Sequence, residues 1–446
     1  MDSSVISLIG IFLGLGLLMF LAFKGYSIVW IAPLCAALVA LMGGLDVLDT
    51  YLNPYMTGLV GFVKSWFPAF MLSAIFGNLM DYTGSAKSIA IWLTKTLGSK
   101  SAIAAIVLGC AVLTYGGVSL FVVVFAIYPL ALHIFEEANI TRKLIPGAIA
   151  LGAFTFTMTA VPGTPQIQNL IPIKYFGTSP TAGPIMGIVA SLILFFGGLA
   201  YLNWRKKQYE GKGERFTPPD AKHAAAAVSN AGLPHPLIAI LPLVMVILVL
   251  NFFPPFLGLI ASDPKNIVIA LLTGIALVML LNLSKKAGFI ESIGKGAQGS
   301  IGAILNTSAA VGFGTVVKTV PGFELLTTML LSIPGNPLIS LSVAVNLLAG
   351  ATGSASGGMG IALEALGAKY MELAKSSGID PQAFHRIASL SSGGLDTLPH
   401  NGAVLTLLNN TGMSHKDSYV DIMVTSLIMP IVATIAAILI ASMGIY

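Results

Sequence analysis

Long apolar stretches alternate with short polar segments along most of the chain. Stretches of roughly spanning length occur at residues 5–22, 27–45, 66–80, 185–203, 237–253, 267–283 and 419–446. A helix needs about 20 mostly apolar residues to cross the hydrocarbon core of a bilayer, so these stretches predict transmembrane helices. The first stretch lacks a basic leader region and a small-residue cleavage site, and it therefore predicts a retained helix. The pattern as a whole predicts an all-α polytopic membrane protein.

Polar residues, glycines and prolines interrupt the apolar sequence at 114–119, 161–169, 352–358 and 393–402. The limbs beside 114–119 and 352–358 are too short to span comfortably, which favours re-entrant hairpins with polar tips. The other two interruptions predict broken helices. Irregular backbone at membrane depth is tolerated only where protein or a water-filled cavity surrounds it. The interruptions are therefore the places where a functional site is expected.

The two halves of the chain share landmarks at a nearly constant offset. An offset of 237 residues relates three pairs: Phe76 and Phe313, Gly116 and Gly353, and Ser119 and Ser356. An offset of 234 residues relates Pro165 and Pro399. This offset predicts two repeats, each with about five transmembrane helices and one re-entrant hairpin. We place the first repeat at 1–204, a cytoplasmic linker at 205–234 and the second repeat at 235–446.

The distribution of Lys and Arg predicts the orientation of the helices. The 205–234 segment carries six basic residues against three acidic ones. Placing it inside puts 15 of the 23 Lys and Arg on the cytoplasmic side and both termini outside. The two repeats then have opposite orientations, although Arg386 is left on the outer side.

Composition excludes several classes of protein. Only 9% of the residues are charged and 56% are hydrophobic, and the net charge of +5 is confined mainly to loops, which argues against nucleic-acid binding. The chain lacks a phosphate-binding G-x-x-x-x-G-K-[ST] motif, and Cys35 and Cys110 lie in apolar stretches without metal-ligand spacing. We therefore expect no cofactor and no metal. An intramembrane serine protease using Ser356 and His400, and an anion channel, are the alternatives from other classes.

The hairpin tips suit an anionic ligand. Small residues at 352–358 allow backbone N–H groups and hydroxyls to approach it, and helix N-termini add positive dipole ends. No predicted spanning segment contains a well-placed arginine, so an anion would depend on these dipoles. Ordinary small-residue helix packing is the alternative interpretation of the tips. Lys318 and Glu364 also lie in apolar context, where they could pair or extend toward the interface.

Two stretches resemble the gluconate:proton symporter (GntP) family. One runs from Met56-Thr57-Gly58 through Lys64-Ser65-Trp66-Phe67-Pro68 to Ile75-Phe76-Gly77-Asn78-Leu79-Met80, and the other is 352–364, Thr-Gly-Ser-Ala-Ser-Gly-Gly-Met-Gly-Ile-Ala-Leu-Glu. The resemblance covers nearly the whole chain and is greatest to the branch of D-3-hydroxybutyrate permeases. It implies a proton-coupled carrier of small organic acid anions in the bacterial inner membrane. It also implies a homodimer with a scaffold and a moving transport domain.

We therefore predict a secondary active transporter that imports a hydroxy monocarboxylate, with D-3-hydroxybutyrate as the best guess. The alternatives are a gluconate or other sugar-acid symporter and a sodium-coupled carboxylate carrier. Asp396 and His400 are the candidates for coupling, although each could instead be structural, Asp396 as a helix-end cap and His400 as a packed polar residue. The candidate substrate-binding residues are Tyr115, Gly116, Gly117, Ser119, Thr164, Gln166, Asn169, Thr352, Gly353, Ser354, Ser356 and Asn401.

Overall fold

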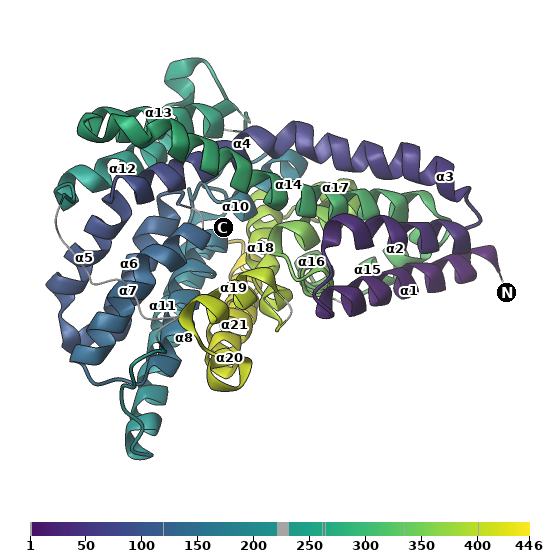
Figure 1. Ribbon diagram of the computed structural model, residues 1–446. Helices are drawn as coiled ribbons and strands as arrows, with labels where there is room; N and C mark the ends of the chain where they lie inside the picture. The colour runs from purple at the N-terminus through teal and green to yellow at the C-terminus, as the bar shows by residue number, and fades with distance from the viewer. Residues whose placement is uncertain are drawn as a thin grey trace.

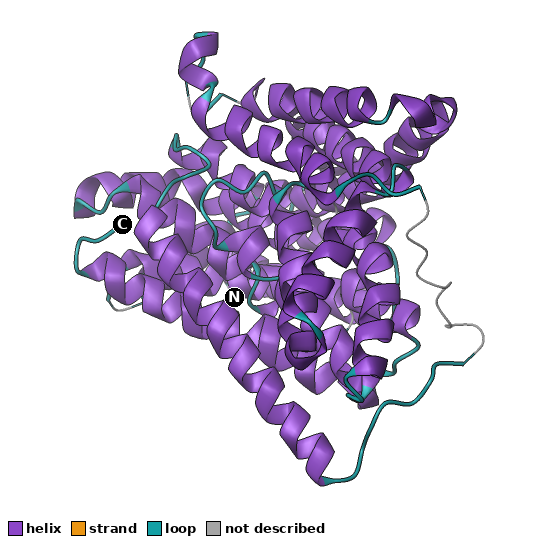
Figure 2. Cartoon of the chain, turned by 90° about the vertical axis from the view of Figure 1, so that its left-hand side faces the viewer, coloured by secondary structure: helices purple, strands orange, loops and turns teal. Residues whose placement is uncertain are grey.

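The computed structural model describes residues 2–118, 120–220, 232–260, 262–263, 265–333, 335–399 and 401–446, and helix is the regular structure throughout these ranges (Figure 2). The first half contains α1 (Ser3–Phe23), α2 (Ile28–Met42), α3 (Val47–Thr50), α4 (Met56–Tyr82), α5 (Ser85–Leu97), α6 (Ala102–Tyr115), α7 (Leu120–Glu137), α8 (Ile145–Ala153), α9 (Phe156–Thr159), α10 (Ile167–Phe176) and α11 (Pro184–Gly211). The second half contains α12 (Pro236–Phe252), α13 (Lys265–Leu281), α14 (Phe289–Thr319), α15 (Gly322–Leu331), α16 (Pro337–Thr352), α17 (Ala355–Ser377), α18 (Pro381–Ser392), α19 (Gly402–Thr411), α20 (His415–Met423) and α21 (Met429–Ser442). Short 3-10 turns cover Ser99–Ser101, Arg142–Leu144, Pro254–Leu257, Leu283–Gly288 and Leu395–Thr397, and π-turns cover Tyr51–Tyr55 and Val424–Ile428.

The predicted apolar stretches are helical. Within the described residues, five helical segments are long and apolar enough to cross a membrane: Ser3–Ala22, Val47–Tyr82, Pro184–Gly211, Leu283–Thr319 and His415–Ser442. A sixth span results if Ser85–Leu97 and Ser99–Tyr115, which meet at an angle of 104°, are counted as one broken span. Helix α11 continues beyond the predicted boundary at residue 204 as far as Gly211, and 221–231 lie outside the described residues.

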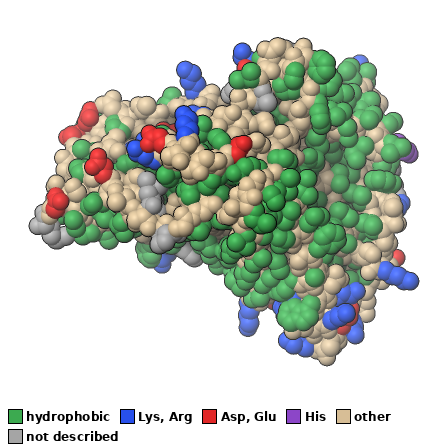
Figure 3. All heavy atoms as spheres, turned by 180° about the vertical axis from the view of Figure 1, so that it is seen from behind, with side chains coloured by type: hydrophobic (Ala, Val, Ile, Leu, Met, Phe, Trp, Pro, Cys, Tyr) green, Lys and Arg blue, Asp and Glu red, His purple; other side chains and the backbone are tan. Residues whose placement is uncertain are grey.

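The outer surface of the protein is apolar. Large hydrophobic side chains are exposed on α1, α11, α12, α13 and α21, among them Phe20, Phe196, Leu237, Leu280 and Leu439. Figure 3 shows hydrophobic side chains over one broad face, with Lys and Arg gathered along its lower edge. A large exposed apolar surface bounded by basic residues is what a bilayer requires of a membrane protein.

Proline and glycine set many of the helix ends. Prolines occupy the first helical position of α11, α12, α16 and α18, where the missing N–H group has no intrahelical acceptor to lose. Glycines with positive φ follow α10, α16, α17 and α19. The same residues end helices inside the apolar stretches, so α16 stops at Thr352 and α18 stops at Ser392. The interruptions predicted at 114–119, 161–169, 352–358 and 393–402 all coincide with helix ends.

The helices pack in the same order in both halves. Helix α1 packs on α2 in the first half, and α12 packs on α13 in the second. Helix α2 also packs on α14 of the other half, just as α13 packs on α4. Helix α6 packs on α8, and α16 packs on α18. Figure 1 shows α4 and α14 running between the α1–α2 pair and the α12–α13 pair. All nine residues of α8 are buried, as are residues 383–392 of α18, so these two short helices form the centre of the molecule.

Helices α4 and α14 approach each other closely and run antiparallel. A Cβ atom on Gly58 would meet Thr315, one on Gly312 would meet Tyr55, and one on Gly296 would lie 2.6 Å from Ile75 Cα. From the Gly58–Thr315 contact to the Ile75–Gly296 contact the chain advances along α4 and goes back along α14, which defines the antiparallel direction. Small residues allow helix backbones to approach closely in a membrane protein.

We expect Gly296→Val to destabilise the protein, because its side chain would collide with the backbone of α4. Overpacking of this kind costs roughly 1–3 kcal/mol. Gly294→Val is the matched control on the same helix, since nothing lies within 4 Å of its added Cβ. The measurement is the apparent melting temperature of each variant in detergent. Equal melting temperatures for the two variants would contradict a close α4–α14 contact.

Candidate functional site

A cavity of about 600 Å³ lies where the second hairpin tip meets the break between α18 and α19. The turn between α1 and α2 lines one end of it, and Gly299, Ala303, Asn306 and Thr307 of α14 line one side. Tyr26, Gly299 and Asn306 are exposed, so this end is the entrance. The inner residues come from the segments around three helix breaks: Thr159 and Gln168 flank the first, Thr352–Ser356 form the hairpin tip, and Asp396, Thr397 and Asn401 belong to the last.

The hairpin tip presents the N-terminus of α17 to the cavity. Gly353 adopts φ +58° and ends α16, and Ser354 then caps α17 by accepting a hydrogen bond from Gly357 N at 3.1 Å. Ala355 and Ser356 line the cavity in the first turn of α17, and Ser356 Oγ lies 3.3 Å from Thr307 Oγ1 of α14. Thr352 Oγ1 donates to Leu348 O at 2.9 Å, so its hydroxyl stabilises the end of α16.

Asn401 connects the hairpin tip to the last helix break. Its Nδ2 donates to Gly353 O at 2.8 Å, while its Oδ1 accepts from Val404 N at 2.9 Å and so caps α19. Gly402 and Ala403, the first residues of α19, line the cavity. The N-termini of α17 and α19 therefore both face the cavity. Unsatisfied N–H groups and positive dipole ends at such positions favour an anion.

Two buried oxygen atoms at the cavity wall have no hydrogen-bond donor. Asp396 is 8% exposed and Gln168 is 5% exposed, and both residues line the cavity. Asp396 Oδ1 and Gln168 Oε1 have no partner among the described residues. A buried acceptor without a donor is energetically unfavourable, so these two atoms are suited to a proton, a cation or a hydroxyl of a ligand.

Six of the first-half candidate residues lie away from the lining of this cavity. Tyr115 OH donates to Pro162 O at 3.0 Å, and Gln166 Nε2 donates to Thr114 O at 2.6 Å. Thr164 Oγ1 donates to Thr157 O at 2.8 Å, and Asn169 Nδ2 donates to Thr164 O at 3.0 Å. A Cβ on Gly116 would meet Leu243, and one on Gly117 would meet Pro165. These contacts join the α6–α7 tip to the first helix break.

Ser119 and His400 lie outside the described residues. Among those that are described, no group of three or more His, Cys, Asp and Glu could hold a metal ion.

The hydropathy pattern missed a buried arginine. Arg386 of α18 is fully buried, whereas the charge distribution had placed it outside and no spanning arginine was expected. Its Nε and Nη2 donate to Ala182 O at 3.0 and 2.6 Å, and its Nη1 donates to Thr159 O at 3.2 Å and Asn169 Oδ1 at 3.0 Å. One feature of the sequence could have indicated the burial of Arg386. Residues 381–392 directly precede the helix break at 393–402, and a helix that lies beside such a break would have its polar residues buried.

Lys318 and Glu364 form an ion pair with each other. Lys318 Nζ of α14 lies 3.3 Å from Glu364 Oε1 of α17, while Tyr175 OH of α10 donates to Glu364 Oε2 at 2.9 Å. Lys174 Nζ lies 3.8 Å from the same carboxylate. This group connects α14 to α17 and α10 near the end of α14 that is distant from Gly299.

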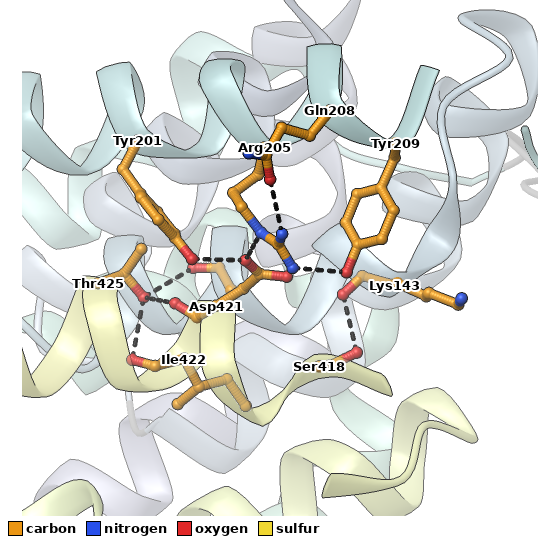
Figure 4. A network of polar contacts seen from close by, with 10 residues as sticks. Lys143, Tyr201, Arg205, Gln208, Tyr209, Ser418, Asp421, Ile422 and Thr425 are labelled. Carbon is orange, nitrogen blue, oxygen red and sulfur yellow. Dashed lines mark hydrogen bonds and ion pairs between the residues drawn. The ribbon is translucent and has the colours of Figure 1, made fainter. Parts of the chain in front are cut away.

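A second polar network connects α11, α20 and the start of α8 (Figure 4). Asp421 is fully buried, and its Oδ1 accepts from Arg205 Nε at 2.7 Å and Tyr201 OH at 2.9 Å. Arg205 also donates to Gln208 and Tyr209, and Ser418 Oγ donates to Lys143 O at 2.7 Å. The carboxylate of Asp421 is thus neutralised by an arginine, whereas that of Asp396 has no cationic partner among the described residues.

No protein-family model matches the chain. It is 42% identical over 452 residues to the uncharacterized transporter YxjC of Bacillus subtilis, covering 94% of this chain and 96% of YxjC. It is 26% identical over 347 residues to an uncharacterized permease of Haemophilus influenzae, covering 68% of each. Its fold is similar to that of the YdaH transporter of Alcanivorax borkumensis, with a TM-score of 0.57, 15% identity and coverage of 88% of this chain and 89% of YdaH. It is also similar to Neisseria gonorrhoeae MtrF, from a class of antimetabolite efflux pumps, with a TM-score of 0.53, 13% identity and coverage of 89% and 84%.

We expect Gly353→Val to abolish ligand binding while the protein still folds and inserts. A valine is strained at φ +58° and would place a branched side chain beside the N-terminus of α17. Gly378→Val is the matched control, because Gly378 has φ +71° at the other end of α17 and open space around it. The measurement is exchange of labelled substrate per folded protein in proteoliposomes. Equal exchange by both variants would remove the tip from the binding site.

Proposed function

We propose that this chain, a multi-pass membrane protein of the transporter family that includes Bacillus subtilis YxjC, is a secondary carrier that imports a small organic acid anion with protons. Its relatives and structural neighbours are transporters or permeases and not enzymes. The proposed substrate is a hydroxy monocarboxylate such as D-3-hydroxybutyrate, and the proposed location is the bacterial inner membrane. The observation that carries the proposal is the cavity where two helix N-termini face one buried, unneutralised carboxylate.

The substrate carboxylate is proposed to bind at the N-termini of α17 and α19. These helices have 23 and 10 residues, long enough for the terminal dipole to develop. The cavity lining described here contains no Lys or Arg, so backbone N–H groups supply the positive potential at the cavity surface. The hydroxyls of Ser356 and Thr307 add donors beside them. Gln168 Oε1 is the proposed acceptor for a substrate hydroxyl, since it is buried and has no donor.

The packing of the helices supports two inverted repeats. By order in the chain α4 corresponds to α14, and α11 corresponds to α20–α21. Repeats related by an axis along the membrane normal would make corresponding helices parallel, whereas inverted repeats make them antiparallel. Helices α4 and α14 pack antiparallel, and so do α11 and α21, in which Ile185 N donates to Tyr446 O and Gly197 faces Met429. We propose 1–204 and 235–446 as the repeats, joined by a cytoplasmic linker at 205–234.

An asymmetry between the repeats supports alternating access. Helix α14 packs extensively on α17, whereas the corresponding helices α4 and α7 barely touch. The α14–α17 face is closed and includes the Lys318–Glu364 ion pair, while the cavity opens at the end marked by Tyr26 and Gly299. In the opposite state we expect α4 and α7 to meet and α14 and α17 to separate. A channel would need neither the approach of α4 to α7 nor the separation of α14 from α17.

The further details of the proposal follow the resemblance noted in the sequence. A homodimer with a fixed scaffold is proposed, with the hairpins and broken helices moving as the transport domain. A gluconate or other sugar-acid symporter remains the alternative substrate assignment, and sodium is the alternative coupling ion at Asp396. Separate pH and sodium gradients imposed on proteoliposomes distinguish the two ions.

We expect Asp396→Asn to bind and exchange substrate but to lose accumulation driven by a pH gradient. Asparagine has the size of protonated aspartic acid and cannot release a proton. The measurement compares counterflow with pH-driven uptake in the same vesicles. Full pH-driven accumulation would make Asp396 a structural residue, and joint loss of binding and exchange would favour sodium coordination.

Asp421→Asn provides the contrast at a second buried carboxylate. Breaking its pair with Arg205 should destabilise the protein by roughly 3–5 kcal/mol. The protein that does fold should keep its pH-driven accumulation, since Asp421 lies in the network of Figure 4 and does not line the cavity.

We expect a disulfide between cysteines at positions 314 and 361 to arrest transport reversibly. A Cβ atom on Gly314 of α14 would lie 3.3 Å from Ile361 Cβ of α17, close to the separation in a disulfide. The double variant Gly314→Cys/Ile361→Cys is made with Cys35 and Cys110 replaced by Ala. Oxidation should stop exchange and reduction should restore it, with Gly314→Cys alone as the control. Undiminished exchange by the cross-linked protein would show that this face need not open.

A further inference from the structure

We infer that Arg386 is the fixed countercharge of Asp396, so that the carrier moves one proton with each monocarboxylate and transfers no net charge. This inference rests on the function proposed above and specifies its stoichiometry and its charge selectivity. Arg386 is a positioning residue here, because it acts through the cavity wall and does not contact the substrate.

The guanidinium of Arg386 is held in place by hydrogen bonds and has space made for it in the packing. Four hydrogen bonds to Ala182 O, Thr159 O and Asn169 Oδ1 hold it in a fully buried position. Two glycines of the neighbouring segment make room for the side chain. A Cβ on Gly183 would lie 2.9 Å from Arg386 Cβ, and one on Gly187 would lie 3.2 Å from its Nε.

The hydrogen bonds of Arg386 place its charge directly behind the cavity wall. Thr159, whose carbonyl accepts from Nη1, lines the cavity. Asn169, which accepts from the same nitrogen, adjoins Gln168, another lining residue. The guanidinium therefore lies one residue behind the surface that a ligand would contact.

No carboxylate pairs with Arg386 among the described residues, and no cation pairs with Asp396 there. The ionisable neighbours of Arg386 are His385 on its own helix and Tyr115 of α6. His385 Nδ1 lies 2.6 Å from Thr178 Oγ1, and its Nε2 lies 3.3 Å from Asn169 Oδ1.

Among the described residues, the ionisable neighbour of Asp396 is Tyr419, whose hydroxyl donates to Thr397 O at 3.2 Å. His415 Nε2 lies 2.9 Å from Pro399 O, at the outer end of the same break. Asp396 is the carboxylic acid in the described lining of the cavity, which also includes the phenol of Tyr26 at the entrance. Among the described residues, one negative and one positive charge, those of Asp396 and Arg386, thus occupy the region of the site.

Charge balance follows from this inventory. In the empty carrier, ionised Asp396 and Arg386 sum to zero. A bound monocarboxylate adds one negative charge, which a proton on the Asp396 carboxylate cancels. Net charge buried in a low-dielectric interior is energetically unfavourable, so the neutral states are the ones that cross. One monoanion and one proton then move together, and a dianion leaves an uncompensated charge.

The test measures uptake of labelled D-3-hydroxybutyrate and gluconate by the wild-type protein in proteoliposomes. A pH gradient with the membrane potential clamped at zero should drive accumulation, with one proton taken up per substrate. A membrane potential of either sign without a pH gradient should leave the initial rate unchanged. Potential-driven uptake, or two protons per substrate, would overturn the inference while leaving the carrier function intact. If the folded protein exchanges neither acid, the proposed function itself fails, and the inference fails with it.

Variants of Arg386 test whether the arginine supplies the countercharge. Arg386→Gln should bind a monocarboxylate roughly tenfold or more weakly, the scale of losing one charge-assisted interaction. Arg386→Lys, which keeps the charge, should recover part of that loss and remain independent of the membrane potential. Arg205→Lys is the control at an arginine away from the cavity, and melting temperatures of all variants separate folding from binding.

Unchanged affinity in folded Arg386→Gln would assign its charge no role in binding. Should that variant fail to fold, Arg386→Lys and the potential measurement on the wild type decide. Loss of pH-driven uptake in His385→Gln together with its retention in Asp396→Asn would move the proton site to His385 and overturn the pairing.

Discussion

Backbone hydrogen bonding inside a membrane is the constraint on which this structure depends. Four interruptions of helix leave N–H and C=O groups without intrahelical partners, and hydrocarbon supplies none. Side chains provide the partners instead. Gln166 donates to the carbonyl of Thr114, Asn401 donates to that of Gly353, and Arg386 donates to those of Thr159 and Ala182. The first two contacts each join two interruptions, and Arg386 joins the buried helix α18 to the end of α9 and to the segment before α11, which holds the breaks at the centre of the molecule.

The first turns of α17 and α19 at these breaks retain N–H groups that their caps do not satisfy. At α17 and α19 the caps Ser354 and Asn401 each accept from one backbone N–H, and the first-turn residues still face the cavity. A local excess of donors results beside the acceptors of Asp396 and Gln168. The same arrangement that keeps irregular backbone stable in the membrane thereby creates a polar cavity with distinct positive and negative regions.

Much of the helical arrangement could be predicted from hydropathy and from glycine and proline. The stretches 5–22 and 237–253 became α1 and α12, and the break at 352–358 became the tip between α16 and α17. The roles of polar residues at the breaks were harder to assign. Gln166 and Asn169 bind backbone groups, whereas Gln168 faces the cavity, and sequence alone does not distinguish a side chain that satisfies the backbone from one that faces a ligand.

Arg386 marks where hydropathy analysis fails in principle. A window average treats an arginine as a reason to place a segment in water, but the four hydrogen bonds that stabilise it come from residues more than 200 positions away. A Cβ atom on Gly183 would lie 2.9 Å from Arg386 Cβ, whereas one on Gly187 would meet Ala160 O at 2.4 Å as well as Arg386 Nε at 3.2 Å. Larger side chains at these two positions would crowd both the arginine and the backbone between α9 and α10. The start of α11 is thus fitted to the arginine and to the neighbouring backbone together, so a change at either glycine disturbs both.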